Sequence, residues 1–281
     1  MSFKTMLVLM DESEDSSARL EVSCSLAEAH GAHLSALAMT QQISTYVAAD
    51  FHAGAAMIDT VQIEQSRQQA QAVAKAANEH IDSRGIFGEA RWTSHEAFGL
   101  REAAGMHGRH ADLIVAGQPV DGFSPDLRGA ALEGALFSSG RPVLMVPAKW
   151  DKPITASHVF VAWDASKQAA RALSDATLFL DRAAKITIVI VDPKPGYDAF
   201  GPDPGVDIAA VLARHCSNVE LDRIPSSGAS VAEALLARAH DTASDLIVMG
   251  GYGHSVLRES VFGGVSREMI ESTTIPLLLS H

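Results

Sequence analysis

Short runs of apolar, largely β-branched residues recur along the chain, separated by longer segments in which apolar positions return every three or four residues. Runs of the first kind predict buried strands of a parallel sheet, and segments of the second kind predict helices packed on that sheet. We expect strands at 6–10, 34–39, 90–92, 112–117, 142–147, 159–163, 186–191, 220–224, 245–248 and 276–279.

The intervening segments predict eight helices and two irregular stretches. Residues 41–60 combine Ala, Gly and polar side chains with weak periodicity, which predicts a loop or a short lid. Residues 192–205 hold four prolines and must be irregular, because proline lacks the backbone N–H that a helix needs. We expect helices at 17–30, 61–81, 96–107, 130–137, 167–181, 206–215, 231–240 and 266–270.

The same order of elements occurs twice. Asp11 and Asp164 follow the first strand of each copy and lie 153 residues apart. Gly117 and Gly250 follow the fourth strand of each copy and lie 133 residues apart. Alternating strands and helices imply right-handed crossovers and a parallel sheet, so the chain is predicted to be α/β, with two tandem open parallel-sheet domains.

A segment without apolar periodicity, residues 148–153, separates the two copies. The length of 281 residues fits two domains of roughly 100–200 residues each. We therefore predict one domain at residues 1–148 and a second at residues 154–281.

The charge balance narrows the classes of partner. The chain has 34 acidic and 22 basic residues, a formal charge of −12, which argues against a general nucleic-acid or anionic-membrane surface. No apolar run approaches the length of about 18 residues that a membrane-spanning helix needs. Cys24 and Cys216 do not indicate a disulfide framework, and the N-terminus lacks the pattern of a signal peptide. A cytoplasmic location is expected.

Glycines are concentrated directly after the apolar run 245–248. Two residues separate Gly250 from Gly253, and nine separate Gly253 from Gly263, which Gly264 follows. Glycine lets a chain turn tightly beside a ligand, and free N–H groups at a helix start can hold an anion. The spacing fits neither a P-loop nor a dinucleotide fingerprint. A glycine-rich surface loop without a ligand is the alternative.

This spacing resembles the nucleotide-binding signature of the universal stress protein family, in which Ser or Thr follows the last glycine. Gly250, Gly253 and Gly263 match, whereas Gly264 stands where the family has a hydroxyl. The resemblance covers nearly the whole chain as a tandem pair and implies a sheet of strand order 3-2-1-4-5 in each domain. It further implies that the second domain binds ATP or ADP, with Mg²⁺ as a further ligand.

Open sheets of this type bind ligands beyond the carboxyl ends of their strands, where the strand order reverses. The resemblance places Asp164 near the ligand, where it would hold Mg²⁺, bond the ribose or merely cap a helix. It places Val191 at the adenine contact. The predicted nucleotide-binding residues are Ala162, Asp164, Val191, Gly250, Gly253, His254, Gly263, Gly264 and Val265.

The first domain carries a degenerate form of the motif. After Gly117 the second glycine is replaced by Val120, Pro119 removes one N–H from the loop, and Ala130 stands ten residues past Val120. A different small-molecule pocket near Asp11 is one interpretation. We favour the other, in which this domain only supports its twin.

Two histidine pairs have a spacing of three residues, His30 with His33 and His107 with His110. A glycine interrupts each pair, so we expect solvated helix ends rather than metal ligands. No Ser–His–Asp order, Cys–His pair or carboxylate pair accompanies the glycine loop, which favours binding over turnover.

The sequence therefore predicts a cytoplasmic protein of the universal stress type that binds an adenine nucleotide in its second domain and has a regulatory rather than catalytic role. The alternatives are a nucleotide-independent stress scaffold and a slow ATPase. The closing strands of the two halves, around 143–145 and 277–279, would lie at apolar sheet edges. We expect these edges to pair within one chain, and chains to form a homodimer through a further apolar patch.

Overall fold

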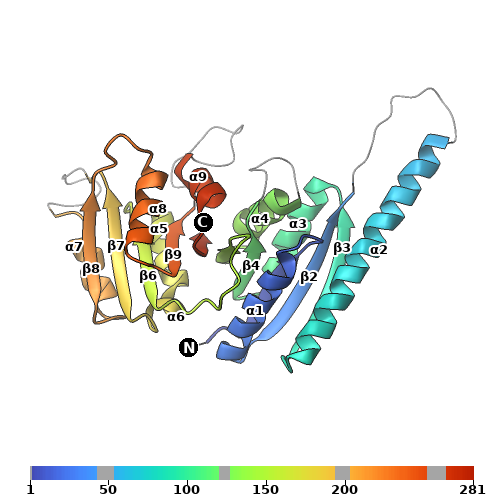
Figure 1. Cartoon of the computed structure of the whole chain (residues 1–281), viewed down its shortest axis with the longest axis horizontal. Helices are drawn as coiled ribbons and strands as arrows, with labels where there is room; N and C mark the ends of the chain where they lie inside the picture. The colour runs from blue at the N-terminus through green and yellow to red at the C-terminus, as the bar shows by residue number, and fades with distance from the viewer. Residues whose placement is uncertain (1, 43–53, 120–126, 194–202, 252–263) are drawn as a thin grey trace. The chain divides into compact units, whose positions relative to one another are not determined.

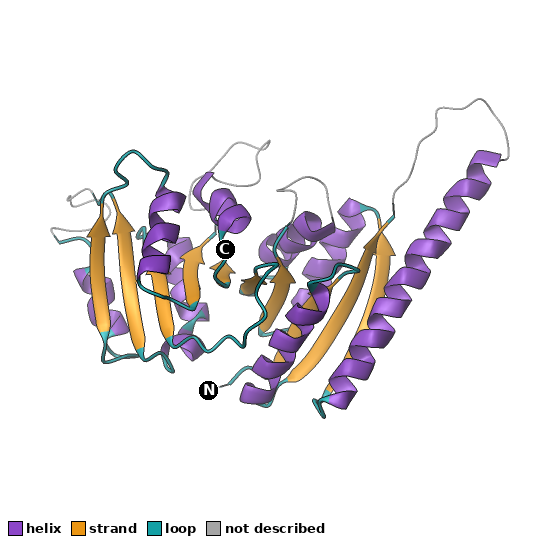
Figure 2. Cartoon of the chain, viewed as in Figure 1, coloured by secondary structure: helices purple, strands orange, loops and turns teal. Residues whose placement is uncertain are grey.

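The computed structural model describes residues 2–42, 54–119, 127–193, 203–251 and 264–281. Its contacts divide the chain into two compact units, residues 2–141 and residues 142–281. Each unit contains a sheet of mostly parallel strands with helices between successive strands (Figures 1 and 2). The predicted linker at 148–153 stays a prediction, since the two compact units meet between residues 141 and 142.

In the first unit, helices cover both faces of a four-stranded parallel sheet ordered β3-β2-β1-β4. Figure 1 shows α1 and α2 on one face and α3 and α4 on the other. Strands β1, β2 and β4 are almost wholly buried, which explains their near-continuous apolar runs. The elements are β1 (Thr5–Met10), α1 (Ser16–His30), β2 (His33–Gln41), α2 (Gly54–Ser83), β3 (Gly88–His95), α3 (Ala97–Gly108), β4 (Leu113–Gly117) and α4 (Leu127–Ser138).

The second unit has the strand order β5-β10-β9-β6-β7-β8. All of its described pairs are parallel except β5 with β10, in which Leu144 lies opposite Leu278. Its elements are β5 (Val143–Val146), β6 (His158–Ala162), α5 (Lys167–Asp175), α6 (Thr177–Leu180), β7 (Lys185–Val191), α7 (Val206–Leu212), β8 (Val219–Ile224), α8 (Val231–Asp241), β9 (Leu246–Gly250), α9 (Gly264–Ser272) and β10 (Leu277–Ser280).

These strand orders confirm the predicted fold class. In the second half, β8-β7-β6-β9-β10 is the order 3-2-1-4-5, and in the first half the first four strands follow 3-2-1-4. Strand β5 closes the first repeat in sequence and pairs with β10, the closing strand of the second repeat. The reversal of order that creates a crevice falls between β1 and β4 in one half and between β6 and β9 in the other.

Several element boundaries differ from the prediction. Helix α2 begins at Gly54 rather than at residue 61, because Ala and Met between them favour helix even where no amphipathic period marks the turn. Strand β3 has eight residues instead of three. It lies at an exposed edge of the sheet, where polar side chains replace the apolar residues that would mark a strand in the sequence. The expected helix at 167–181 is two, α5 and α6, divided at Ala176.

Candidate functional site

Three predicted residues of the second half meet at one edge of its sheet. Ala162 ends β6, Val191 ends β7 and Gly250 ends β9. Strand β6 runs parallel to both β7 and β9, with Val189 and Met249 as the partners of Ala162. Ala162, Val191 and Gly250 therefore lie at the carboxyl ends of neighbouring strands, where the strand order reverses.

Asp164 lies beyond this edge in the turn from β6 to α5, and its side chain is exposed. Its Oδ1 accepts a hydrogen bond from the N–H of Ser166 at 3.0 Å, which closes the turn. The helix cap is Ser166, whose Oγ accepts the N–H of Ala169 at 3.1 Å. Asp164 is thus not the cap of α5, and its carboxylate is placed at the edge where a ligand would lie.

Gly250 has a packing role that the sequence does not reveal. A β-carbon added there would lie 2.4 Å from the backbone nitrogen of Ala169 and 2.6 Å from the carbonyl carbon of Gln168. The first turn of α5 therefore approaches the end of β9 so closely that only glycine fits. The helix backbone occupies the space that we expected this glycine to leave for a ligand.

Gly264 and Val265 begin α9, the helix that follows the glycine motif. A β-carbon on Gly264 would meet no atom within 4 Å, and Val265 is partly exposed. Gly253, His254 and Gly263 lie outside the described residues. The structure therefore describes the strand edge and the helix start, and the predicted contacts of the loop between them remain predictions.

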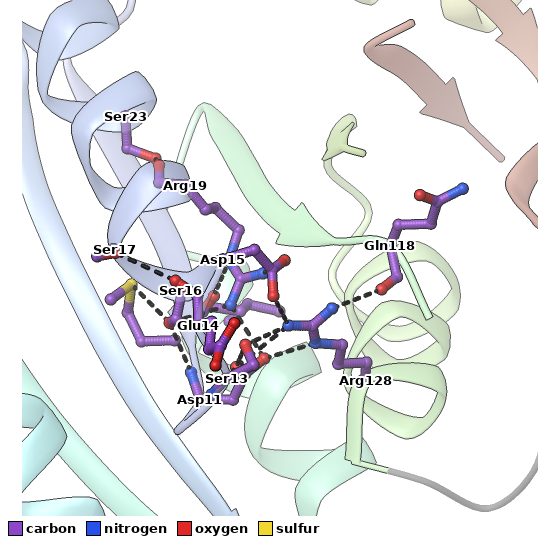
Figure 3. Close-up of polar contacts among 12 residues, drawn as sticks. Asp11, Ser13, Glu14, Asp15, Ser16, Ser17, Arg19, Ser23, Gln118 and Arg128 are labelled. Carbon is purple, nitrogen blue, oxygen red and sulfur yellow. Dashed lines mark hydrogen bonds and ion pairs between the residues drawn. The ribbon is translucent and has the colours of Figure 1, made fainter. Parts of the chain in front are cut away.

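The corresponding crevice of the first half is filled by an ionic cluster (Figure 3). Asp11 follows β1, as Asp164 follows β6, and its Oδ1 accepts the N–H of Ser13 at 2.9 Å in an equivalent turn. Its Oδ2, however, accepts hydrogen bonds from Nη2 of Arg19 at 3.0 Å and from Nε of Arg128 at 2.9 Å. Only 8% of Asp11 is exposed to solvent.

Both arginines are held by further bonds from different elements. Nε of Arg19 donates to the carbonyl of Leu9 at 2.9 Å, and Nη1 of Arg128 donates to the carbonyl of Gln118 at 2.9 Å. Both guanidinium groups also form ion pairs with Asp15. The cluster therefore joins the ends of β1 and β4 to the starts of α1 and α4.

The electrostatics of the cluster favour its charged form. Burial by itself would raise the pKa of Asp11, but the charges of Arg19 and Arg128 and the bonds that Arg128 and Ser13 donate lower this pKa to about 2. Complete burial lowers the pKa of Arg19, and the adjacent charge of Asp11 counteracts this. Asp11 is thus ionised throughout the physiological pH range.

Little space remains around this cluster. The residual cavity measures about 10 Å³, and its lining includes Met10, Met39 and Arg128. A cavity of this size has room for about one water and not for a small-molecule ligand. Gly117 is required here, because an added β-carbon would lie 1.9 Å from Nη1 of Arg19. The filled crevice therefore agrees with the interpretation of a supporting half, and a ligand pocket near Asp11 stays a prediction.

Sequence reasoning missed Arg19 and Arg128. The second half has Ala172 at the position 153 residues after Arg19, and Phe262 at the position 134 residues after Arg128. The comparison of the two repeats could have revealed both arginines as substitutions confined to the first half. An arginine in an otherwise apolar helix face is a further signal, because arginine is rarely buried without a partner.

The two members of the first histidine pair, His30 and His33, both pack against an aromatic ring. His30 is buried, its Nδ1 accepts the N–H of Phe3 at 3.4 Å, and the two rings lie 4.8 Å apart, so the prediction of a solvated helix end is wrong for this residue. His33 packs edge-on against Phe87 at 5.0 Å. Within the described ranges, no group of three or more His, Cys, Asp or Glu side chains is placed to hold a metal ion.

The comparisons with known proteins agree with this geometry. No protein-family model matches the chain. A universal stress protein of Synechocystis sp. is 25% identical over 175 residues, which span 59% of this chain and 57% of that relative. A universal stress protein structure from Archaeoglobus fulgidus matches with a TM-score of 0.72 at 20% identity, covering 98% of this chain and 95% of that one.

A second structure, of a protein from Pseudomonas aeruginosa described as a universal stress protein, matches with a TM-score of 0.59 at 14% identity, covering 99% of this chain and 93% of that one. The fold and the crevices define a tandem α/β protein with open parallel sheets. Its fold is that of the universal stress proteins, and the curated relative supports the resemblance inferred from the glycine spacing. No helix in the described part of the chain is long and apolar enough to span a membrane.

Proposed function

We propose that the chain binds one adenine nucleotide, ATP or ADP, at the carboxyl edge of its second half, and that its first half supports this site without binding a nucleotide. The observation that carries the proposal is the contrast between the two equivalent aspartates. Asp11 is buried and bonded to two arginines, whereas Asp164 is exposed, and the second repeat has alanine where the first has Arg19.

The proposal gives each described residue of the edge a physical role. The small apolar side chains of Ala162 and Val191 offer a surface on which a base would lie. The carboxylate of Asp164 accepts hydrogen bonds from a ribose or binds Mg²⁺. The N–H groups and the helix dipole at the start of α9, near Gly264, favour negative charge such as a phosphate.

A regulatory role in a stress response follows from the resemblance and not from the site. The described residues of the second half's edge include no paired nucleophile and base, which supports binding rather than rapid turnover. A slow ATPase, with Asp164 ordering a metal or water, and a scaffold that needs no nucleotide are the competing functions. The proposal also includes a cytoplasmic location and association of the chain with a second copy of itself.

Calorimetric titration of the full chain with ATP and with ADP tests this proposal. We expect one nucleotide per chain. Gly253→Val should abolish binding, because a β-carbon in the glycine motif would intrude on the ligand, while far-UV circular dichroism stays near native. The matched control is Val120→Gly, the reverse change at the equivalent position of the first half, which should create no second site.

The competing functions give different results in the same preparation. Two equivalent sites per chain, or unchanged affinity in Gly253→Val, would overturn the proposed site. A chain that binds neither nucleotide would favour the scaffold. Release of phosphate from ATP by the parent but not by Asp164→Asn, with binding retained, would identify the slow ATPase.

A further inference from the structure

A cavity of about 240 Å³ lies in the first half, at the opposite end of the strands from the ionic cluster. Its floor is one face of the sheet, formed by alternate residues of neighbouring strands, because side chains two apart point the same way. Helix α3 covers the adjacent part of this face, and its C-terminal end forms the wall. The lining includes Leu7, Leu37, Glu89, Arg91, His107 and Ala111.

The cavity has an apolar floor and a polar mouth. Leu7, Leu37 and Ala111 supply apolar surface, and each is at most 3% exposed. Ser35 is only partly buried although it lies in the middle of a sheet with strands on both sides. This exposure of an inner strand shows that the cavity is open to solvent over β2.

Arg91, His107 and His110 are brought together in the lining of the cavity. Burial, the charge of Arg91 and the neighbouring imidazole of His110 lower the pKa of His107, in that order. Arg91, from β3, forms an ion pair with Glu89 two residues earlier on the same strand. A guanidinium has five N–H donors, so one carboxylate partner does not exhaust it.

We propose that this cavity is a binding site for a small organic monocarboxylate, with the carboxylate between Arg91 and His107 and the apolar body against Leu7 and Leu37. Pockets for drug-sized ligands measure roughly 300–1,000 Å³, so a cavity of this size takes a shorter molecule. Arginine and protonated histidine make the charge-assisted bonds that a carboxylate needs. This site is independent of the proposed nucleotide site, because every lining residue belongs to the unit 2–141.

Binding should be linked to proton uptake. Burial, Arg91 and His110 lower the pKa of His107. A bound anion beside His107 favours the protonated imidazole, so binding should raise this pKa again. Affinity should therefore increase as the pH falls through the pKa of His107. The other titratable groups that face the cavity are His33 from β2, Glu89 from β3 and His110 after α3.

The test uses sodium butyrate as the probe and NMR titration of the histidine ring signals in the full chain, with His107 assigned from His107→Gln. We expect saturable binding that raises the pKa of His107 and is about tenfold tighter at about pH 5.5 than at about pH 8. Butyramide and butylammonium, which share the apolar body but lack negative charge, should not bind.

Matched variants locate the site. Arg91→Gln should weaken butyrate binding about tenfold, and His107→Gln should remove the pH dependence. Arg223→Gln is the control, because Arg223 lies on β8, the equivalent edge strand of the second half, and pairs with Asp203 as Arg91 pairs with Glu89. It should leave butyrate affinity unchanged.

Three results would each overturn the proposal: an unshifted His107 signal in the parent chain, equal affinity for butyrate and butyramide, or equal weakening by Arg91→Gln and Arg223→Gln. Inorganic phosphate binding as tightly as butyrate would also contradict it, since phosphate has no apolar body to use the floor. The titrations of the parent chain decide the question even if a variant fails to fold.

Discussion

Nε of Arg128 lies 2.9 Å from Oδ2 of Asp11, which connects residues 117 positions apart in sequence and joins the start of α4 to the end of β1. This bond lies in the first half, in the crevice where an open parallel sheet would receive a ligand. The cavity beside the cluster measures only about 10 Å³. In the second repeat the equivalent aspartate, Asp164, is exposed, so the two repeats differ at this place in the fold.

The first prediction concerns the stability that Asp11 provides. Asp11→Asn removes the negative charge shared by two arginines, of which Arg19 is 2% exposed. Breaking a buried ion pair by removing one partner costs about 3–5 kcal/mol, because the remaining charge stays buried without compensation. Urea unfolding followed by circular dichroism should show a loss of about this size in the free energy of unfolding.

Asp164→Asn is the matched control for this variant. Asp164 is exposed and makes the same type of turn bond to a serine N–H, which asparagine also accepts. Its effect on unfolding should stay within about 0.5 kcal/mol, as for most surface substitutions. Equal losses in the two variants would show that the ionic cluster contributes no special stability.

The second prediction concerns acid. The pKa of Asp11 is lowered from 3.8 to about 2 in the folded chain. Its contribution to stability is therefore fully present above the unfolded pKa and is lost as the pH falls through the folded pKa. Linkage makes the pH-dependent part of this contribution about 2 kcal/mol.

Unfolding free energies measured at intervals between about pH 5 and about pH 2 provide the test. The stability difference between the parent and Asp11→Asn should decrease with falling pH in this window. A difference that stays constant from about pH 5 to about pH 2 would mean that Asp11 has an ordinary pKa in the folded state.

The apolar runs predicted the strands because buried parallel strands leave a direct record in sequence, whereas the strand order came from the resemblance to the universal stress proteins. Strand β6, with its buried Val159, Phe160 and Val161, is an example. The cluster around Asp11 leaves no such record, since its partners come from elements that only the folded chain brings together. The length of edge strand β3 was underestimated because many of its side chains are exposed, as Trp92 is, and exposed positions need not be apolar.

The third prediction concerns Gly264 and rests on the proposed nucleotide site. An added β-carbon there would meet no atom within 4 Å, so a serine fits at the start of α9 without strain. Its hydroxyl would restore the group that the universal stress protein signature has at this position. A hydrogen bond to a charged group contributes about 1.5–3 kcal/mol, so Gly264→Ser should bind ATP about tenfold tighter or more.

Gly264→Ala separates the hydroxyl from the β-carbon. Calorimetry should show an affinity for ATP close to that of the parent, because alanine adds the carbon without a donor or acceptor. If serine and alanine change the affinity equally, the effect belongs to the helix start and not to a bond with phosphate. If serine weakens binding, the ligand needs the unobstructed backbone at Gly264.

The last prediction concerns the closing strands of the two repeats. Strand β10 lies between β5 and β9, with Leu278 opposite Leu144 on one side and Val248 on the other. The carbonyls of Pro276 and Ser280 accept the N–H groups of Ile247 and Gly251, so the even-numbered residues of β10 direct their backbone bonds toward β9. The N–H and C=O of a residue in a strand point the same way, and successive residues alternate. Leu277 and Leu279 therefore direct theirs toward β5.

Proline substitutions distinguish the two sides, because proline removes one N–H from the ladder. Leu279→Pro should accelerate amide hydrogen exchange in β5, the closing strand of the first repeat, more than in β9. Leu278→Pro should have the reverse effect. Each variant loses one fully buried leucine from the same strand, so the two changes to the core are matched. Slow exchange of β5 in Leu279→Pro, equal to that in the parent, would show that the closing strands of the two repeats do not pair.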